Sequence, residues 1–282
     1  MKGRVLIVAG SDSGGGAGIQ GDIKAVTALG GYAATAITAL TAQNTKGVFG
    51  VHAVPVGFIR QQMEVVLTDI GADAIKTGML HNADVIETVI AVLAALAADC
   101  PLVVDPVMVA KGGERLLDRD AERVLRDRLL PRAAIVTPNL PEAEALLGEP
   151  IADLDAMKRA ASMLRKLGPG AVLLKGGHHQ GPFVEDVFAV GDDVEVFRSR
   201  RIETTNTHGT GCALASAIAT GLAQGMALRA AVARARAYVH EAIRRAPEIG
   251  GGYGPLDHAH TVKPFSAPDA RPSTPRRPLA RH

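Results

Sequence analysis

The segment Thr204-Thr205-Asn206-Thr207-His208-Gly209-Thr210-Gly211-Cys212 is followed by small residues from 213 to 219. We predict that its glycines form a turn that opens a helix. Backbone N–H groups at a helix N-terminus lack partners within the helix, and the helix dipole adds positive potential, so the turn predicts an anion site. A thiol placed there is expected to have a lowered pKa. This combination favours phosphoryl transfer, although an ordinary helix cap with a small buried cysteine stays an alternative.

The composition indicates a globular chain with a large aliphatic core. Of its 282 residues, 47% are hydrophobic and only 3% are aromatic, and there is no Trp. The 31 basic and 29 acidic side chains nearly balance, which argues against a nucleic-acid-binding protein. The two cysteines, Cys100 and Cys212, indicate neither a disulfide framework nor a cysteine zinc site. The apolar runs are too short for a signal peptide or a membrane span, so we expect a cytoplasmic protein that binds no membrane.

Short apolar runs alternate with longer amphipathic segments along the chain. Predicted strands cover residues 4–9, 32–40, 48–54, 72–77, 102–105, 133–136 and 171–174, and a hairpin covers 183–197. Helices are predicted between them, the last two at 212–224 and 229–245. This alternation is typical of an α/β fold, a mostly parallel sheet with helices on both faces. We expect one domain over residues 1–265 and a disordered tail, rich in Pro and Arg, over 266–282.

A second glycine pattern, Gly16-Ala17-Gly18-Ile19-Gln20-Gly21, matches the Gly-x-Gly-x-x-Gly motif of dinucleotide-binding folds. That motif also requires an acidic residue about 20 positions further on, to bind a ribose hydroxyl. No Asp or Glu occurs between Asp22 and Glu64. An NAD-binding oxidoreductase is therefore kept only as a remote alternative.

Seven motifs occur in a fixed order and together resemble one family. They are residues 10–20 (GSDSGGGAGIQ), 39–45 (ALTAQNT), 76–80 (KTGML), 105–108 (DPVM), 137–143 (TPNLPEA), 174–178 (LKGGH) and 206–212 (NTHGTGC). The chain resembles the hydroxymethylpyrimidine/phosphomethylpyrimidine kinases of thiamin biosynthesis, in the ribokinase-like superfamily, over residues 5–264. The resemblance implies a three-layer αβα fold. It also implies a kinase that uses ATP and Mg²⁺ to phosphorylate 4-amino-5-hydroxymethyl-2-methylpyrimidine and then its monophosphate.

The resemblance places one group of residues at the substrate. Gln43 would hydrogen-bond the aminopyrimidine, because an amide offers a donor and an acceptor together. The other members are Met79, Val107 and Met108, which would line the ring, and Gly16, Ala17 and Asp22, which would face it from the first loop. Without the resemblance, Gln43 is interpreted as a solvent-exposed loop residue and the three apolar residues as core.

A second group would bind the nucleotide. Asn139 and Glu142 match the Asn-x-x-Glu motif of the superfamily, which positions magnesium and phosphates; alone, they would be interpreted as a helix capping box. Lys175 would meet phosphate as a point charge. The remaining members are Thr205 and His208 on the nucleotide side, and Asp105, which would bind the metal together with Glu142. For His208, a structural hydrogen bond within the turn stays open.

The last motif carries the implied catalytic residues. Most ribokinase relatives end it with Asp as the base, whereas Cys212 occupies that position here. We expect its thiolate to assist deprotonation while the N–H groups of Gly209, Thr210 and Gly211 stabilise the transferred phosphoryl group. Residues 111–113 (KGG) are expected to form a closing flap.

Pyridoxal kinase is the nearest alternative function, since apolar pockets discriminate poorly between similar substrates. The residues 42–44 (AQN) and the Gly-Thr-Gly-Cys motif favour the pyrimidine kinase. We expect a homodimer, the commonest oligomer, and no appended thiamin-phosphate synthase domain.

Overall fold

An eight-stranded sheet is the middle layer of the computed structural model, which describes residues 1–109, 113 and 116–263. The strand order across the sheet is β10-β9-β8-β7-β6-β5-β1-β2. The strands are β1 (Arg4–Ala9), β2 (Tyr32–Ile37), β5 (Ala74–Thr77), β6 (Leu102–Val104), β7 (Ile135–Val136), β8 (Ala171–Leu174), β9 (Phe183–Val190) and β10 (Asp193–Arg200). Pairing is parallel from β2 to β8, and β9 is antiparallel to both of its neighbours. The predicted α/β class with a mostly parallel sheet is confirmed.

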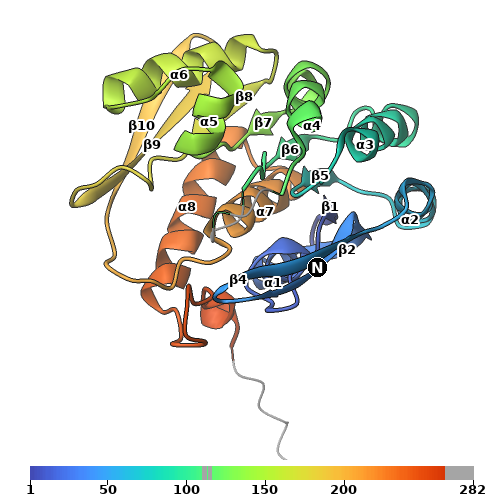
Figure 1. Cartoon of the computed structure of the whole chain (residues 1–282), viewed down its shortest axis with the longest axis horizontal. Helices are drawn as coiled ribbons and strands as arrows, with labels where there is room; N and C mark the ends of the chain where they lie inside the picture. The colour runs from blue at the N-terminus through green and yellow to red at the C-terminus, as the bar shows by residue number, and fades with distance from the viewer. Residues whose placement is uncertain (110–112, 114–115, 264–282) are drawn as a thin grey trace, which may run out of the picture.

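Helices cover both faces of this sheet (Figure 1). One face carries α2 (Val56–Asp69), α3 (Ala83–Leu96), α4 (Arg119–Val124), α5 (Leu140–Leu147) and α6 (Leu154–Lys166). The other carries α1 (Gly18–Ala28), α7 (Thr210–Ala223) and α8 (Leu228–Arg244). Strand β1 is a continuous apolar run because both of its faces are covered: Leu6 and Val8 pack toward the first group, and Val5 and Ile7 toward the second.

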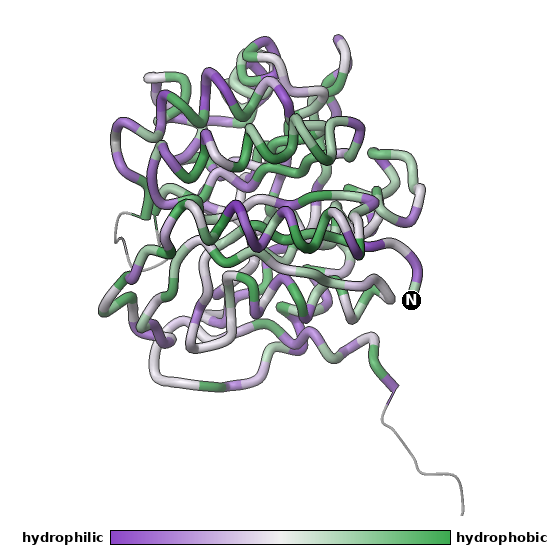
Figure 2. Tube along the Cα trace, turned by 90° about the vertical axis from the view of Figure 1, so that its right-hand side faces the viewer, coloured by the Kyte–Doolittle hydropathy of each residue, from purple (hydrophilic) through white to green (hydrophobic). Residues whose placement is uncertain are grey.

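Helices α6 and α8 have the amphipathic pattern that packing on a sheet requires, whereas α7 is buried continuously from Ala213 to Gly221. Figure 2 shows them as coils in which hydrophobic and hydrophilic stretches alternate. Asn82 is the N-cap of α3, a role that Asn commonly has, and its Oδ1 accepts a hydrogen bond of 3.0 Å from Val85 N. No helix in the described part of the chain combines the length and the hydrophobicity needed to cross a membrane.

The predicted single strand over residues 32–40 is wrong. Strand β2 ends at Ile37, and the chain then leaves the main sheet as β3 (Ala39–Asn44), which pairs with β4 (Gly47–Ala53) in a separate two-stranded sheet. Thr38 lies between the strands, and its buried Oγ1 donates to the Met79 carbonyl at 2.7 Å. That bond satisfies the hydroxyl where the chain changes direction. Gln43 therefore lies on a strand and not in a loop.

The boundaries of other helices differ less from those predicted from the sequence. The sequence pattern predicts one helix over residues 120–130, but the chain is α-helical only to Val124. It continues as a π-helical turn, Leu125–Leu129, and a 3-10 turn, Leu130–Arg132. Helix α7 begins at Thr210, two residues before the predicted start. The expected flap at residues 111–112 and the expected tail at 266–282 lie outside the described residues, whereas Gly113 is described.

Candidate active site

The N-terminal turn of α7 (residues 209–212) lies at the carboxyl edge of the sheet, next to the first loop (residues 10–17). Gly209 caps the helix in the left-handed conformation, with φ of 80°. A Cβ added there would lie 1.9 Å from the carbonyl oxygen of Gly16, so only glycine fits between the two segments. Thr210, Gly211 and Cys212 form the first helical turn and are half-buried. Their position supports the predicted anion site, because N–H groups of a first turn have no acceptor within the helix.

The predicted low pKa of Cys212 is wrong for this structure. Burial, with Asp22 and Asp105 adding to it and Lys76 opposing it, raises the pKa of the thiol to about 12. The positive end of the helix does not outweigh the loss of hydration together with the repulsion from these two carboxylates. Cys212 is therefore a neutral thiol at pH 7. Its suggested role as a base stays a prediction.

A lysine–carboxylate cluster adjoins the α7 turn. Lys175 Nζ lies 3.0 Å from Asp105 Oδ1 and 4.0 Å from Glu142 Oε2. A Cβ added at Gly211 would lie 3.1 Å from Lys175 Nζ and 3.7 Å from Asp105 Oδ2, so the cluster directly faces the first turn of α7. Although burial favours the neutral amine, Asp105 and Glu142 raise the pKa of Lys175 above its ordinary value. The cluster thus brings a fixed positive charge to the predicted anion site.

Asn139 and Glu142 form the capping box of α5. Asn139 Oδ1 accepts from Glu142 N at 2.9 Å, and Glu142 Oε2 accepts from Asn139 N at 2.7 Å. Burial, with Asp105 nearby and Lys175 opposing it, raises the pKa of Glu142 to about 7. The helix-capping interpretation is confirmed, and a role toward the nucleotide stays a prediction that is compatible with it.

The expected metal ligands are two carboxylates, those of Asp105 and Glu142. Within the described residues, no group of three or more His, Cys, Asp or Glu side chains is arranged to hold a metal ion. Mg²⁺ usually retains several waters and binds one or two carboxylates together with substrate phosphates. The pair beside Lys175 fits that mode of binding, and it does not fit a cage made of protein ligands alone.

Asp22 is not at the surface of the site. Its side chain is fully buried, with Oδ2 at 2.8 Å from Lys76 Nζ and Oδ1 accepting from Ser216 Oγ at 2.6 Å. Both oxygens are thus engaged beneath the first loop, which corrects the expectation that Asp22 faces the substrate. The ion pair joins α1, β5 and α7, three elements that meet under the α7 turn.

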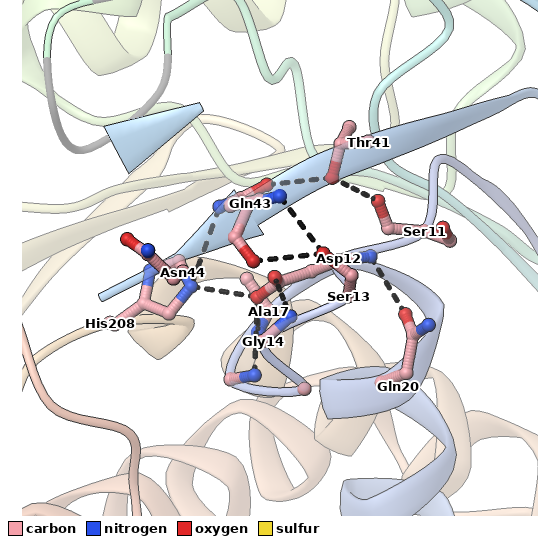
Figure 3. A network of polar contacts seen from close by, with 12 residues as sticks. Ser11, Asp12, Ser13, Gly14, Ala17, Gln20, Thr41, Gln43, Asn44 and His208 are labelled. Atoms are coloured by element: carbon pink, nitrogen blue, oxygen red, sulfur yellow. Dashed lines mark hydrogen bonds and ion pairs between the residues drawn. The ribbon is translucent and has the colours of Figure 1, made fainter. Parts of the chain in front are cut away.

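The first loop is organised by Asp12 (Figure 3). Asp12 Oδ1 accepts from Gly14 N at 2.8 Å, while Oδ2 accepts from Ala17 N at 2.8 Å and from His208 Nε2 at 2.8 Å. Burial alone would raise the pKa of Asp12, but the bond from His208 and the backbone amides hold it below its usual value. His208 is itself buried. The structural hydrogen bond expected for His208 within its own turn is instead a bond to the first loop.

Gln43 is held at the same junction. Its backbone is fixed to the first loop, because Ser13 Oγ donates to the Gln43 carbonyl at 2.8 Å. Its side-chain amide lies between Thr41 Oγ1, which is 3.1 Å from Oε1, and His208 Nε2, which is 3.5 Å from Nε2 of the amide (Figure 3). The structure therefore brings together two residues that are 165 positions apart, and Gln43 is half-buried rather than free in solvent.

The other predicted substrate residues are unequally placed. Met79 is 8% exposed and lies against Gly10, where an added Cβ would be 2.9 Å from its sulfur. Val107 is half-buried. Met108 is buried in the larger apolar core, which agrees with its alternative interpretation as a core residue. Thr205 is exposed and lies in the segment before α7, whose other residues are at least half-buried from residue 206 to residue 208.

Two residues that organise the site were missed. Lys76 interrupts the apolar strand β5, and a charged residue in a strand buried on both faces is a signal for a buried partner. Asp12 stands among glycines and serines, where an aspartate commonly accepts bonds from the backbone two or more residues further on. Both signals were available, but neither indicates which partner is used.

A glycine turn at a helix N-terminus faces a lysine–carboxylate cluster at the carboxyl edge of an αβα sheet. This arrangement suits phosphoryl transfer by a small-molecule kinase. The chain belongs to the phosphomethylpyrimidine kinase family, whose family model matches residues 12–257. A Cβ added at Gly16 would meet His208, and one added at Gly18 or Gly21 would lie within 3 Å of a backbone carbonyl oxygen, so these glycines permit close packing of the first loop.

Two curated relatives illustrate the match in sequence. Hydroxymethylpyrimidine/phosphomethylpyrimidine kinase of Streptomyces coelicolor is 48% identical over 254 residues, which cover 90% of this chain and 93% of the relative. The thiamine biosynthesis bifunctional protein ThiED of Geobacter sulfurreducens is 54% identical over 91% of this chain. The match spans only 52% of that bifunctional protein.

Two solved structures confirm the fold. A phosphomethylpyrimidine kinase from Clostridium difficile superposes with a TM-score of 0.76 at 41% identity, over 86% of this chain and 100% of that one. A pyridoxal kinase from Bacillus subtilis, solved as an ADP complex, superposes with a TM-score of 0.86 at 34% identity, over 92% of this chain and 98% of that one. The ribokinase-like three-layer architecture is thus shared with kinases for two kinds of acceptor.

Proposed function

We propose that this chain is a kinase of thiamin biosynthesis that transfers the γ-phosphoryl group of ATP to 4-amino-5-hydroxymethyl-2-methylpyrimidine and then to its monophosphate. The observation that carries the proposal is the contact between the α7 turn and the lysine–carboxylate cluster. Gly211 leaves the Lys175 amine free to approach an anion seated on the turn. Phosphoryl transfer requires mainly such positioned positive charge and oriented backbone donors.

The nucleotide phosphates would lie between the α7 turn and Lys175. Magnesium, held by Asp105 and Glu142, would supply positive charge to the phosphate oxygens. The N–H groups of the α7 turn would stabilise the transferred phosphoryl group, whose negative charge is spread over three oxygens. Asn139 would keep Glu142 oriented through the capping box.

Cys212 would meet the acceptor hydroxyl as a neutral thiol. A loose transition state needs little deprotonation of the nucleophile before transfer. The sulfur would accept a weak hydrogen bond from the acceptor hydroxyl, which orients the hydroxyl oxygen toward the phosphoryl group. Lys76, at the foot of the site, would limit the build-up of negative charge around Cys212.

The test compares three acceptors with saturating ATP and Mg²⁺: the hydroxymethylpyrimidine, its monophosphate and pyridoxal. We expect kcat/KM for both pyrimidines to exceed that for pyridoxal by at least about tenfold, the lower end of what small pocket differences discriminate. Lys175→Met, which removes the charge but retains much of the side-chain volume, should abolish transfer to all three. Preference for pyridoxal would contradict the proposal and indicate a kinase of vitamin B6 metabolism. If Lys175→Met were as active as the wild type, the proposed phosphate site would be wrong.

A further inference from the structure

Hydrogen bonds hold the backbone of Lys175 on both sides of its Cα. Its own N–H donates at 2.8 Å to the carbonyl oxygen of Pro138, just beyond β7. The next N–H, that of Gly176, donates at 2.9 Å to Oδ1 of Asp186 on β9. Because peptide groups are planar, holding the group before and the group after a residue restrains both of its backbone dihedrals. The direction in which the Lys175 side chain leaves the backbone therefore depends on Asp186.

The Gly176 amide bonds to a side chain because the pairing of β8 with β9 ends before it. The last pair of that ladder is Leu174 with Val187. A Cβ added at Gly176 would lie 1.9 Å from the carbonyl oxygen of Glu185, so the backbone passes β9 too closely for any residue but glycine. The carboxylate of the next residue, Asp186, accepts the amide hydrogen in place of a strand carbonyl.

Arg236 on α8 holds the Asp186 carboxylate in turn. Its Nε donates to Asp186 Oδ2 at 2.7 Å, and its Nη2 donates to the Phe197 carbonyl oxygen on β10 at 3.2 Å. The side chains of Arg236 and Asp186 are only 13% and 10% exposed. A buried ion pair is often no more stabilising than a well-packed apolar pair of the same volume, so stability alone does not account for it.

We propose that Asp186 and Arg236 are positioning residues for phosphoryl transfer. Arg236 orients the Asp186 carboxylate, and the carboxylate holds the Gly176 amide so that the amine of Lys175 faces the α7 turn. Both residues act through Lys175, and the inference rests on the proposed function for the identity of the anion there, the phosphates of ATP.

The lysine amine needs such a restraint because its side chain is long and flexible. Lys175 Nζ lies 3.1 Å from the position of a Cβ added at Gly211, so the charge faces the turn at close range. A misplacement of about 1 Å at a reacting centre can cost about 100-fold in rate. A small change in the backbone of Lys175 is therefore enough to weaken the phosphate site.

Two substitutions at Arg236 separate its hydrogen bond from its charge, because both remove the charge. In Arg236→Gln, the amide nitrogen is the same number of bonds from Cα as Nε of arginine, so a donor to Asp186 Oδ2 is retained. In Arg236→Met, a methyl group takes that place and the donor is lost. Any difference between the two variants reports the hydrogen bond.

Arg229→Met is the matched control. Arg229 is also on α8, donates to Glu195 of the same hairpin at 2.7 Å, and lies 5.7 Å from the centre of the Phe197 ring. Its partner is on the edge strand β10, which β9 separates from β8. The control therefore removes a link between α8 and the hairpin without changing the carboxylate that holds Gly176.

The first arm measures hydrogen–deuterium exchange of the Gly176 amide by NMR, without nucleotide. We expect Arg236→Met to speed exchange about tenfold, the value of about one hydrogen bond, and Arg236→Gln to stay within about threefold of the wild type. Arg229→Met should exchange like the wild type. Unchanged exchange in Arg236→Met would overturn the inference, whatever the protein phosphorylates.

The second arm measures by calorimetry, with Mg²⁺, the affinity for the non-hydrolysable analogue β,γ-methylene-ATP and for adenosine, which has no phosphate. Arg236→Met should weaken binding of the analogue about tenfold and leave adenosine unchanged, whereas Arg236→Gln should bind both like the wild type. Equal weakening in the Met and Gln variants would assign the effect to charge and overturn the inference. An equal loss of adenosine affinity would also overturn it.

Lys175→Met is the background that tests whether the pair acts through the lysine. Alone, it should weaken the analogue by about 10- to 100-fold, the value of a hydrogen bond to a charged group. Adding Arg236→Met should then cause no further loss, because the amine that the pair positions is already absent. A further tenfold loss would overturn the inference.

The two failures are distinguishable. If Lys175→Met bound the analogue as tightly as the wild type, the phosphate site of the proposed function would be wrong. If Lys175→Met bound it weakly but Arg236→Met bound it like the wild type, the inference would be overturned and that phosphate site would stand.

Discussion

Replacing Gly209 by Ala tests whether the contact between the α7 turn and the first loop holds the site together. The new Cβ would lie 1.9 Å from the Gly16 carbonyl oxygen, and φ of 80° adds strain for any residue but glycine. The left-handed conformation costs about 1–2 kcal/mol. Relieving the clash costs a further ~1–3 kcal/mol, as for an overpacked core. The turn would also move away from the first loop, so we expect kcat to fall by about 100-fold, the effect of losing one well-placed donor.

Gly225→Ala is the control, because Gly225 has the same φ of 80° and no atom within 4 Å of the added Cβ. Urea unfolding gives the free energy of unfolding of each variant, and steady-state kinetics with the pyrimidine and ATP gives kcat. Gly225→Ala should lose only the strain energy and retain full kcat. If Gly209→Ala matched the control in both stability and kcat, the tight contact would have no structural or catalytic role.

Three further predictions concern buried groups. Lys76→Met breaks the fully buried ion pair with Asp22, so urea unfolding should show a free energy of unfolding that is lower by about 3–5 kcal/mol. Lys158→Met is the control, because its ion pair is largely exposed, and it should change that free energy by less than about 1 kcal/mol. Cys212→Ala should greatly lower kcat without changing the KM for ATP. Unchanged turnover would show that Cys212 has no role in phosphoryl transfer. Burial, with a nearby lysine, lowers the pKa of His258 to about 4. The unfolded chain therefore binds more protons between about pH 4 and 6.5, so wild-type stability should fall as pH drops through that window. His258→Asn should reduce this slope in urea unfolding, while the exposed His52→Asn should not.

The order of strands and helices could be predicted because buried strands and amphipathic helices have distinct patterns. Strand β1 is apolar from residue 5 to residue 9, and Asn82 caps the start of α3. The pattern failed at residues 32–44, where both β2 and β3 contain small and β-branched residues. The break at Thr38 depends on a bond to Met79, which is distant in the sequence.

The local motifs of the site could be predicted from the sequence better than the contacts between them. The glycine turn and the Asn139–Glu142 capping box were predicted because each has a local signature, whereas Lys175 was predicted from the resemblance to the kinase family. The bond from His208 to the first loop joins residues 196 positions apart, which no local pattern encodes. The pKa of Cys212 was predicted in the wrong direction because the helix N-terminus is visible in the sequence, whereas the burial and the nearby carboxylates that outweigh it are visible only in the fold.

We expect this chain to phosphorylate one pyrimidine twice, first on a hydroxyl and then on a phosphate. The most direct measurement is ³¹P NMR of the products formed from the hydroxymethylpyrimidine, excess ATP and Mg²⁺. The account predicts a monophosphate resonance that appears first and is replaced by the two coupled resonances of the pyrimidine diphosphate. Accumulation of the monophosphate alone, or transfer to pyridoxal with none to the pyrimidine, would contradict it.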